Sequence, residues 1–181
     1  IVDVVDERLD KLTELSKSKK KIYTNITFVD IAGLVKGASK GEGLGNKFLS
    51  HIREVDAIIH LVRCFESEKI THVNSKINPV EDLETIKTEI ILSDIDIIQK
   101  KLEKGKKKLL EEKQIKILEE KLNQLNEGKE ISIKDNEEKK FLSSLGLLSI
   151  KPKIIVCNVD EGSLANGNAF TKESADNIYE K

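Results

Sequence analysis

Three short apolar runs along the chain predict β-strands. Residues 24–29 alternate in part and stop at Asp30, whereas residues 57–62 and 153–157 are almost continuously apolar. Continuous runs of this length are typical of strands buried on both faces, as in a parallel sheet covered by helices. A glycine-rich segment follows the first run, and residues 44–54 then carry apolar side chains at helical spacing. The order strand, loop, helix, strand predicts an α/β fold.

The middle of the chain has a different pattern. Residues 80–126 repeat apolar positions at helical spacing, and Gly105 is their only glycine. One straight helix of that length would be unusual in a globular domain, so the pattern predicts two antiparallel helices with a turn near residues 105–113. A polar return loop at 126–136 and a short helix at 137–148 are expected to lead into the third strand.

Charge and composition exclude several classes of protein. The 181 residues suit about one domain, and 31 basic against 32 acidic residues leave a net charge of −1. This balance excludes binding to nucleic acid or membranes through bulk charge. No apolar run approaches the roughly 18–20 residues that cross a bilayer, and the start of the chain is not a signal peptide. We therefore expect a cytoplasmic protein with no membrane and no sequence-specific DNA partner.

Two further counts refine this picture. Cys64 and Cys157 lie in the strand-like runs and are expected to be reduced, buried thiols. Residues 100–140 hold 13 Lys and 10 acidic residues, so the helical hairpin could contact acidic partners, although a solvated helix surface explains the same pattern. Because the chain contains no Met, we expect it to be a piece of a longer protein.

The segment that follows the first predicted strand could bind phosphate. Asp30 and Gly33 form a D-x-x-G pattern, in which the carboxylate can hold Mg²⁺ and the glycine N–H can meet a terminal phosphate. Alone, the pattern also fits an ordinary turn. Five of the ten glycines lie within residues 33–45, and glycines permit close backbone approach. Their clustering favours a switch that a ligand orders over a flexible surface loop.

The third predicted strand ends in a second polar motif. Asn158, Val159, Asp160 and Glu161 stand where guanine-specific P-loop GTPases hold N-K-x-D, whose Asp accepts two hydrogens from guanine. Val159 replaces the Lys and Glu161 replaces the Asp, so the acceptor moves and strict selection of guanine should be lost. An ordinary polar loop at a strand end is the alternative explanation.

One histidine and one missing motif complete the candidate chemistry. His72 lies in a predicted loop and could orient water at a phosphate, although a histidine in a loop is more often simply solvated. His60 suits an interior position in a strand, and His51 suits a surface or packing position on the helix after the glycine-rich segment. The chain contains no G-x-x-x-x-G-K-[ST] run, and therefore lacks the backbone cradle and Lys that hold a triphosphate.

Several of these runs together resemble one family. The most distinctive run is FVDIAGLVKGAS at residues 28–39, which continues as KGEGLGNKFL to residue 49. Further pieces are DERLDKL (6–12), VRCFE (62–66), ITHV (70–73), DLETI (82–86) and NVDE (158–161). The combination resembles the YchF/Obg-like ATPase family, and the resemblance covers nearly the whole chain.

The resemblance implies an α/β fold of the P-loop NTPase class, interrupted by an antiparallel helical hairpin or coiled coil. Residues 1–82 and 137–181 would be parts of the G-domain, and residues 83–136 the inserted hairpin. Relatives begin with a P-loop strand and end with a TGS domain. By this resemblance the P-loop strand is expected before Ile1 and the TGS domain after Lys181, which puts the activity of the isolated chain in doubt.

The resemblance also implies the ligands and the site residues. The family prefers ATP to GTP and uses Mg²⁺, with Asp30 and Gly33 at the metal and the γ-phosphate. Leu34 stands where many GTPases keep a catalytic Gln, and His72 matches the loop histidine proposed to replace it. Asn158, Val159 and Glu161 match the motif that recognises the base, with Val159 packing on adenine.

The implied protein hydrolyses ATP slowly and works with the ribosome or ribosome-associated factors. An Obg- or DRG-like GTPase is one alternative, disfavoured by Ala32, where those families carry Pro, and by Glu161. A non-hydrolytic interaction module built on the hairpin is the other alternative, and the missing P-loop keeps it open.

Overall fold

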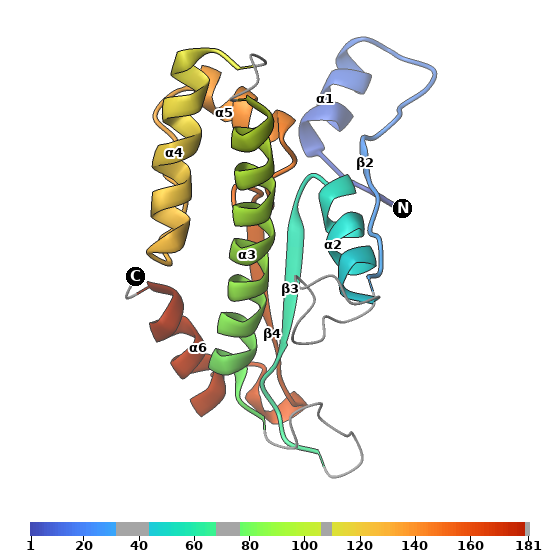
Figure 1. Cartoon of the computed structure of the whole chain (residues 1–181). Coiled ribbons are helices and arrows are strands. Elements are labelled where there is room, and N and C mark those ends of the chain that lie inside the picture. The colour runs from blue at the N-terminus through green and yellow to red at the C-terminus, as the bar shows by residue number, and fades with distance from the viewer. Residues whose placement is uncertain (32–43, 68–76, 106–109, 180–181) are drawn as a thin grey trace. The chain divides into compact units, whose positions relative to one another are not determined.

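The computed structural model describes residues 1–31, 44–67, 77–105 and 110–179. The chain divides into two compact units, Ile1–Ala32 and Gly33–Lys181, and each is described by itself (Figure 1). None of the helices in the described ranges combines the length and apolar character needed to cross a membrane.

The first unit is a short helix beside a two-stranded ribbon. Strand β1 (Val2–Asp3) pairs antiparallel with β2 (Asn25–Ile26), with Val2 opposite Ile26. Helix α1 (Glu7–Leu15) begins at Asp6, whose carboxylate accepts a hydrogen bond from the Arg8 N–H at 2.9 Å. A carboxylate at this position satisfies a backbone donor that the first helical turn leaves free.

The strand predicted at residues 24–29 is shorter in the structure. Only Asn25–Ile26 is extended and paired, and the apolar side chains of Phe28 and Val29 are exposed. The reason is that β1, the partner strand, is only two residues long, so β2 cannot pair with it over a longer stretch. Asp30 therefore does not end a buried strand.

The second unit contains a parallel strand pair. Strand β3 (Ile58–Arg63) pairs with β4 (Lys153–Asn158) in a register that runs from Ile58 opposite Lys153 to Arg63 opposite Asn158. Helix α2 (Leu44–Glu54) precedes β3. These elements confirm the helix predicted at 44–54 and the two later strands, and the parallel pairing with its helices confirms the α/β fold.

Helices bury one face of this strand pair. Val62 and Cys64 pack with Leu83 of α3 (Pro79–Gly105) and with Phe170 of α6 (Ala169–Tyr179). The expectation that both faces are buried is not met within the described ranges, because alternate side chains of a strand face opposite ways and one set stays in solvent. This exposed set is Ile59, Leu61, Ile154 and Val156, with exposures from 39% to 62%.

The helical hairpin forms as predicted. Helix α3 and helix α4 (Glu112–Asn126) run antiparallel (Figure 1), with a core of Ile98, Leu102, Leu118 and Leu125. Gly105 ends α3, where an added Cβ would lie 2.4 Å from the Leu110 side chain. Any other residue at Gly105 would therefore require the Leu110 side chain to move.

Helix α5 (Asn136–Ser144) is shorter than the helix predicted at 137–148. It begins at Asp135, whose carboxylate accepts from the Glu138 N–H at 2.8 Å. It ends because Gly146 has a φ of +71°, a left-handed conformation that terminates helices. Leu142 and Leu147 join the hairpin core from this segment.

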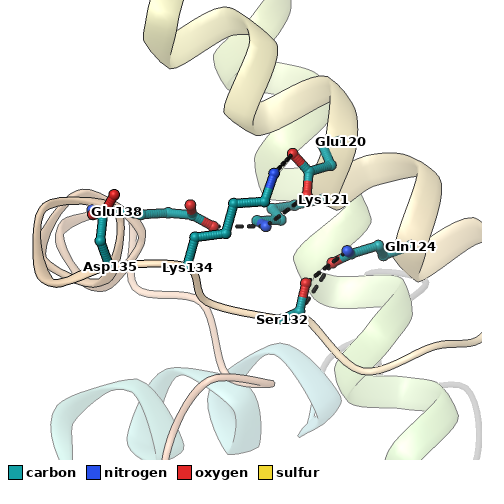
Figure 2. Close-up of polar contacts among 7 residues, drawn as sticks. All are labelled: Glu120, Lys121, Gln124, Ser132, Lys134, Asp135 and Glu138. Carbon is teal, nitrogen blue, oxygen red and sulfur yellow. Dashed lines mark hydrogen bonds and ion pairs between the residues drawn. The ribbon is translucent and has the colours of Figure 1, made fainter.

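A buried ion pair joins α4 to α5 (Figure 2). The Lys121 side chain is 0% exposed and its Nζ lies 2.6 Å from Oε1 of Glu138, which is 5% exposed. Glu120 contacts the same ammonium at 3.2 Å and also pairs with Lys134 at 2.6 Å. Two opposite charges thus enter the core together, and their attraction offsets part of the desolvation cost of burying each one.

A buried carboxylate anchors the turn that leads into β4. Asp94 of α3 is fully buried, and accepts from the N–H groups of Leu148 and Ser149 at 2.9 and 2.8 Å. The Ser149 hydroxyl donates to it as well, at 2.5 Å. Burial raises the pKa of Asp94, and these hydrogen bonds and the charge of Arg53 oppose the rise.

The end of α2 is hydrogen-bonded to the region around Asp94. Arg53 donates from Nη2 to Ser93 Oγ at 2.5 Å. Lys151 donates from Nζ to the Arg53 carbonyl at 2.9 Å and to the Val55 carbonyl. We call the set Arg53, Ser93, Asp94, Ser149 and Lys151 the Asp94 joint. It holds α2, α3 and the start of β4 at one place.

We expect Glu138→Gln to lower the free energy of unfolding by about 3 kcal/mol, because the substitution removes the shorter, buried partner of the Lys121 ammonium and leaves only the 3.2 Å contact to the more exposed Glu120. Urea unfolding followed by circular dichroism measures the change. Glu137→Gln is the matched control, since Glu137 lies next to Glu138 and its ion pair with Lys113 is solvent-exposed. Equal effects of the two substitutions would contradict the role given to the buried pair.

Candidate functional site

The carboxyl ends of β3 and β4 lie side by side. The Cys64 N–H donates to the Asn158 carbonyl at 2.7 Å, which extends the strand pairing one step past β3. Residues 158–164, here called the base loop, leave the sheet at this edge. Ligands of open parallel α/β sheets bind outside the carboxyl ends of the strands. The edge is therefore the candidate site.

Asp160 fixes the shape of the base loop. Its Oδ1 accepts from the Ser163 N–H and its Oδ2 accepts from the Ser163 hydroxyl, both at 3.0 Å. These bonds start a single turn of 3₁₀-helix, η2 (Glu161–Ser163). The Asp160 carboxylate is thus occupied by the loop itself.

Glu161 is placed differently from its neighbour. Its side chain is exposed, and no described residue forms a hydrogen bond or ion pair with its carboxylate. Of the two acidic residues in the motif, Glu161 is therefore the one available to accept hydrogens from a ligand.

Val159 and Asn158 flank the strand end. Val159 is half-buried and packs against the Val62, Cys64 and Leu83 cluster. The Asn158 side chain is exposed, while its carbonyl takes part in the strand pairing. In the structure the Val159 side chain packs on the core beneath the loop. A contact between Val159 and adenine remains a prediction.

Sequence reasoning did not single out Asn168, which lies beside the base loop. It caps the N-terminus of α6: its Oδ1 accepts from the Thr171 N–H at 3.1 Å, and its own N–H donates to the Thr171 hydroxyl at 2.8 Å. Its Nδ2 donates to the Cys64 carbonyl at 2.7 Å. An Asn followed three residues later by Thr, ahead of a helical run, was the available signal.

The remaining predicted site residues belong to other parts of the chain. Asp30 belongs to the first unit, is exposed and follows β2 by four residues. Gly33 and His72 lie outside the described residues. The structure therefore brings together Asn158, Val159 and Glu161, and describes Asp30 only within its own unit.

Asp30 is the predicted metal ligand, and its side chain is exposed. Among the described residues, no group of three or more His, Cys, Asp or Glu side chains could hold a metal ion. Mg²⁺ commonly takes one or two carboxylates together with water and ligand phosphates. The exposed carboxylate of Asp30 meets that requirement.

Burial shifts the pKa of two groups, one on β3 and one directly after it, in the direction that favours their neutral forms. Burial raises the pKa of the Cys64 thiol to about 11, aided by the adjacent Cys157 and opposed by the Ser174 hydroxyl. Burial also lowers the pKa of His60, against the influence of Asp82. Both cysteines are free thiols as expected, although Cys157 is only half-buried.

Comparison with known proteins agrees with this architecture. A family model described as 50S ribosome-binding GTPase matches residues 8–159. The ribosome-binding ATPase YchF of Mycoplasma pneumoniae is 50% identical over 173 residues, covering 92% of this chain and 48% of the relative. The YchF of Bacillus subtilis is 47% identical, covering 92% of this chain and 47% of the relative.

A solved structure adds the fold. The Schizosaccharomyces pombe YchF GTPase has a TM-score of 0.81 and 36% identity, covering 99% of this chain and 51% of the other. The parallel sheet, its helices and the family model together define a G-domain of the P-loop GTPase class. Within that class, the chain belongs to the YchF family. It spans about half the length of the curated relatives it matches.

We expect iodoacetamide at about pH 8 to modify Cys157 in the native protein and to leave Cys64 unmodified. The thiolate is the reacting species, and a pKa of about 11 leaves roughly one Cys64 thiol in a thousand ionised at that pH. Peptide mass spectrometry measures the labelling, and protein unfolded in guanidinium chloride, where both cysteines should react, is the control. Rapid labelling of native Cys64 would contradict its burial.

Proposed function

We propose that the protein binds ATP together with Mg²⁺, hydrolyses it slowly and acts in the cytoplasm as a nucleotide-dependent switch. The observation that carries the proposal is the base loop, which presents the Glu161 carboxylate at the carboxyl end of a parallel strand while Asp160 is occupied in shaping the turn. Membership of the YchF family supports it, because the relatives from Mycoplasma pneumoniae and Bacillus subtilis are named ribosome-binding ATPases.

Base selection follows from which carboxylate is available. In guanine-specific GTPases an Asp accepts two hydrogens from the base, and the pairing rejects purines that lack them. Glu161 carries its acceptor one methylene farther out, which displaces it from that position. The neighbouring Asp160 cannot substitute without giving up both bonds to Ser163. Guanine therefore loses its advantage, and adenine is accepted.

The other predicted residues would act at the phosphate end of the ligand. Asp30 would hold Mg²⁺ and the Gly33 N–H would donate to the terminal phosphate. When bound, Mg²⁺ neutralises negative charge on the phosphates. His72 would orient the attacking water, a role that Leu34 cannot fill because its side chain has no polar atom.

We assign the ribosome or ribosome-associated factors as partners, and the helical hairpin as the contact surface. The names of the relatives support the first assignment. Exposed lysines of the hairpin support the second, although Lys100 and Lys116 are paired with acidic neighbours one helical turn away. Contact with an acidic partner would therefore exchange these local pairs for new ones.

A non-hydrolytic interaction module is the second candidate function. The observation that favours it is the lack of a G-x-x-x-x-G-K-[ST] motif in this chain. Isothermal titration with ATP, using the protein as its gene encodes it, separates the two candidates. Binding supports the switch, and the lack of any binding supports the module.

We expect the double substitution Val159→Lys, Glu161→Asp to shift the ratio of ATP to GTP affinity toward GTP by about tenfold or more. The change restores the Lys and the shorter carboxylate that guanine recognition uses. Competition between the two nucleotides for binding measures the ratio. Glu173→Asp, an exposed position on α6, is the control, and an unchanged ratio in the double variant would refute the assignment of the base loop.

We expect His72→Ala to lower kcat for ATP hydrolysis about a hundredfold with little change in KM, because the lost group acts on the attacking water rather than on binding. Release of phosphate measures the rate. His51→Ala removes an exposed histidine of α2 and should keep the full rate. Full turnover in the His72 variant would remove that residue from the mechanism.

A further inference from the structure

We propose that Asn168 is the positioning residue that fixes the base loop against the end of β3, and that purine selection depends on it. The inference rests on the proposed function, since it concerns how the same base loop is held in place. Asn168 contacts both polypeptide segments at the candidate site and lies outside the recognition motif itself.

The Asn168 side chain uses both ends of its amide. Its Oδ1 accepts from the Thr171 N–H at 3.1 Å, which caps α6. Its Nδ2 donates to the Cys64 carbonyl at 2.7 Å and lies 3.4 Å from the Ser163 hydroxyl oxygen. Flipping the amide would set donor against donor at Thr171 and acceptor against acceptor at Cys64, so the chemistry of the partners fixes its orientation.

These bonds connect the ends of the two strands through one residue. Cys64 donates its N–H to the Asn158 carbonyl and receives the Asn168 amide on its own carbonyl. The first bond holds the start of the base loop. The second holds the start of α6, which follows the loop along the chain. The start of the loop and the start of α6 are therefore both bonded to the backbone of one residue, Cys64, which directly follows β3.

The contact to Ser163 reaches the interior of the loop. Ser163 closes η2 and is bonded to both oxygens of Asp160. Asn168, Ser163 and Asp160 thus form a chain of contacts around the turn that carries Glu161. Displacing Asn168 would release this turn from the sheet and change where the Glu161 carboxylate lies.

The backbone before Asn168 leaves little freedom to compensate. Gly167 has a φ of +68°, and its N–H donates to the Ser163 carbonyl at 2.8 Å. A Cβ at this position would lie 2.5 Å from the Thr171 hydroxyl oxygen. The chain is therefore held in a conformation that glycine adopts easily, and Asn168 enters the site from a fixed direction.

The substitution Asn168→Asp separates the two tasks of this side chain. Aspartate is as good a helix cap as asparagine, so the bond from the Thr171 N–H is kept. The donor to Cys64 is replaced by a carboxylate oxygen that faces a carbonyl oxygen. The variant therefore removes the tie between loop and strand while retaining the start of α6.

The test is the ratio of ATP to GTP affinity, measured by isothermal titration with the protein as its gene encodes it. Contributions of the triphosphate cancel in this ratio because both nucleotides share it. We expect Asn168→Asp to bring the ratio about tenfold closer to one, on the scale of one lost hydrogen bond. Asn168→Ser, which keeps a cap but is too short to reach Cys64, should change the ratio in the same direction and covers the case in which the Asp variant does not fold.

Thr171→Val is the matched control. It removes the hydroxyl that accepts from the Asn168 N–H and weakens the same helix cap, but leaves the Nδ2 bond to Cys64. We expect a lower Tm with an unchanged ratio. A wild-type ratio in both Asn168 variants would overturn the inference and leave the proposed function intact. A wild-type protein that does not bind ATP would overturn the proposed function, and the inference with it.

Discussion

The buried carboxylate of Asp94 is the interaction on which the arrangement of the second unit depends. It lies on the long helix α3 and accepts three hydrogen bonds from the turn at Leu148 and Ser149. That turn leads directly into β4. Lys151, two residues farther on, donates to the carbonyl groups at the end of α2. The position of β4 beside β3, and with it the base loop, is therefore set from the side of the helical hairpin.

The pattern of the sequence predicted the parts whose structure is determined locally. Helical spacing located α2 and the two hairpin helices, and apolar runs located β3 and β4, because these features follow from periodicity alone. The strand predicted before Asp30 was too long, since a strand also needs a partner of matching length and β1 has only two residues. The prediction that both sheet faces are buried was likewise not met within the described residues, because apolar content does not say what covers a face.

The candidate site also contains features that the sequence predicts and features that depend on the fold. The motif Asn158 to Glu161 stands out because its residue types and its place after a strand carry the information. The sequence does not reveal that Asp160 shapes the loop while Glu161 stays available to a ligand, because this depends on which carboxylate bonds to Ser163. Asn168 was missed for a similar reason. Its cap is visible in sequence, but its bond to Cys64, far away along the chain, is a property of the fold.

The parallel pairing of β3 and β4 has a consequence for how the chain reaches this structure. Lys151 and Val55, bonded at the start of this pairing, are separated by 96 positions in sequence, and closing so long a loop costs entropy before any strand contact forms. Antiparallel helices such as α3 and α4 need only local contacts, so contact order predicts that they close before the strands pair. Their core would then bring Asp94 within reach of the segment before β4 and shorten the loop that the strands must close. On this argument the hairpin between β3 and β4 acts as a folding scaffold for the strand pair.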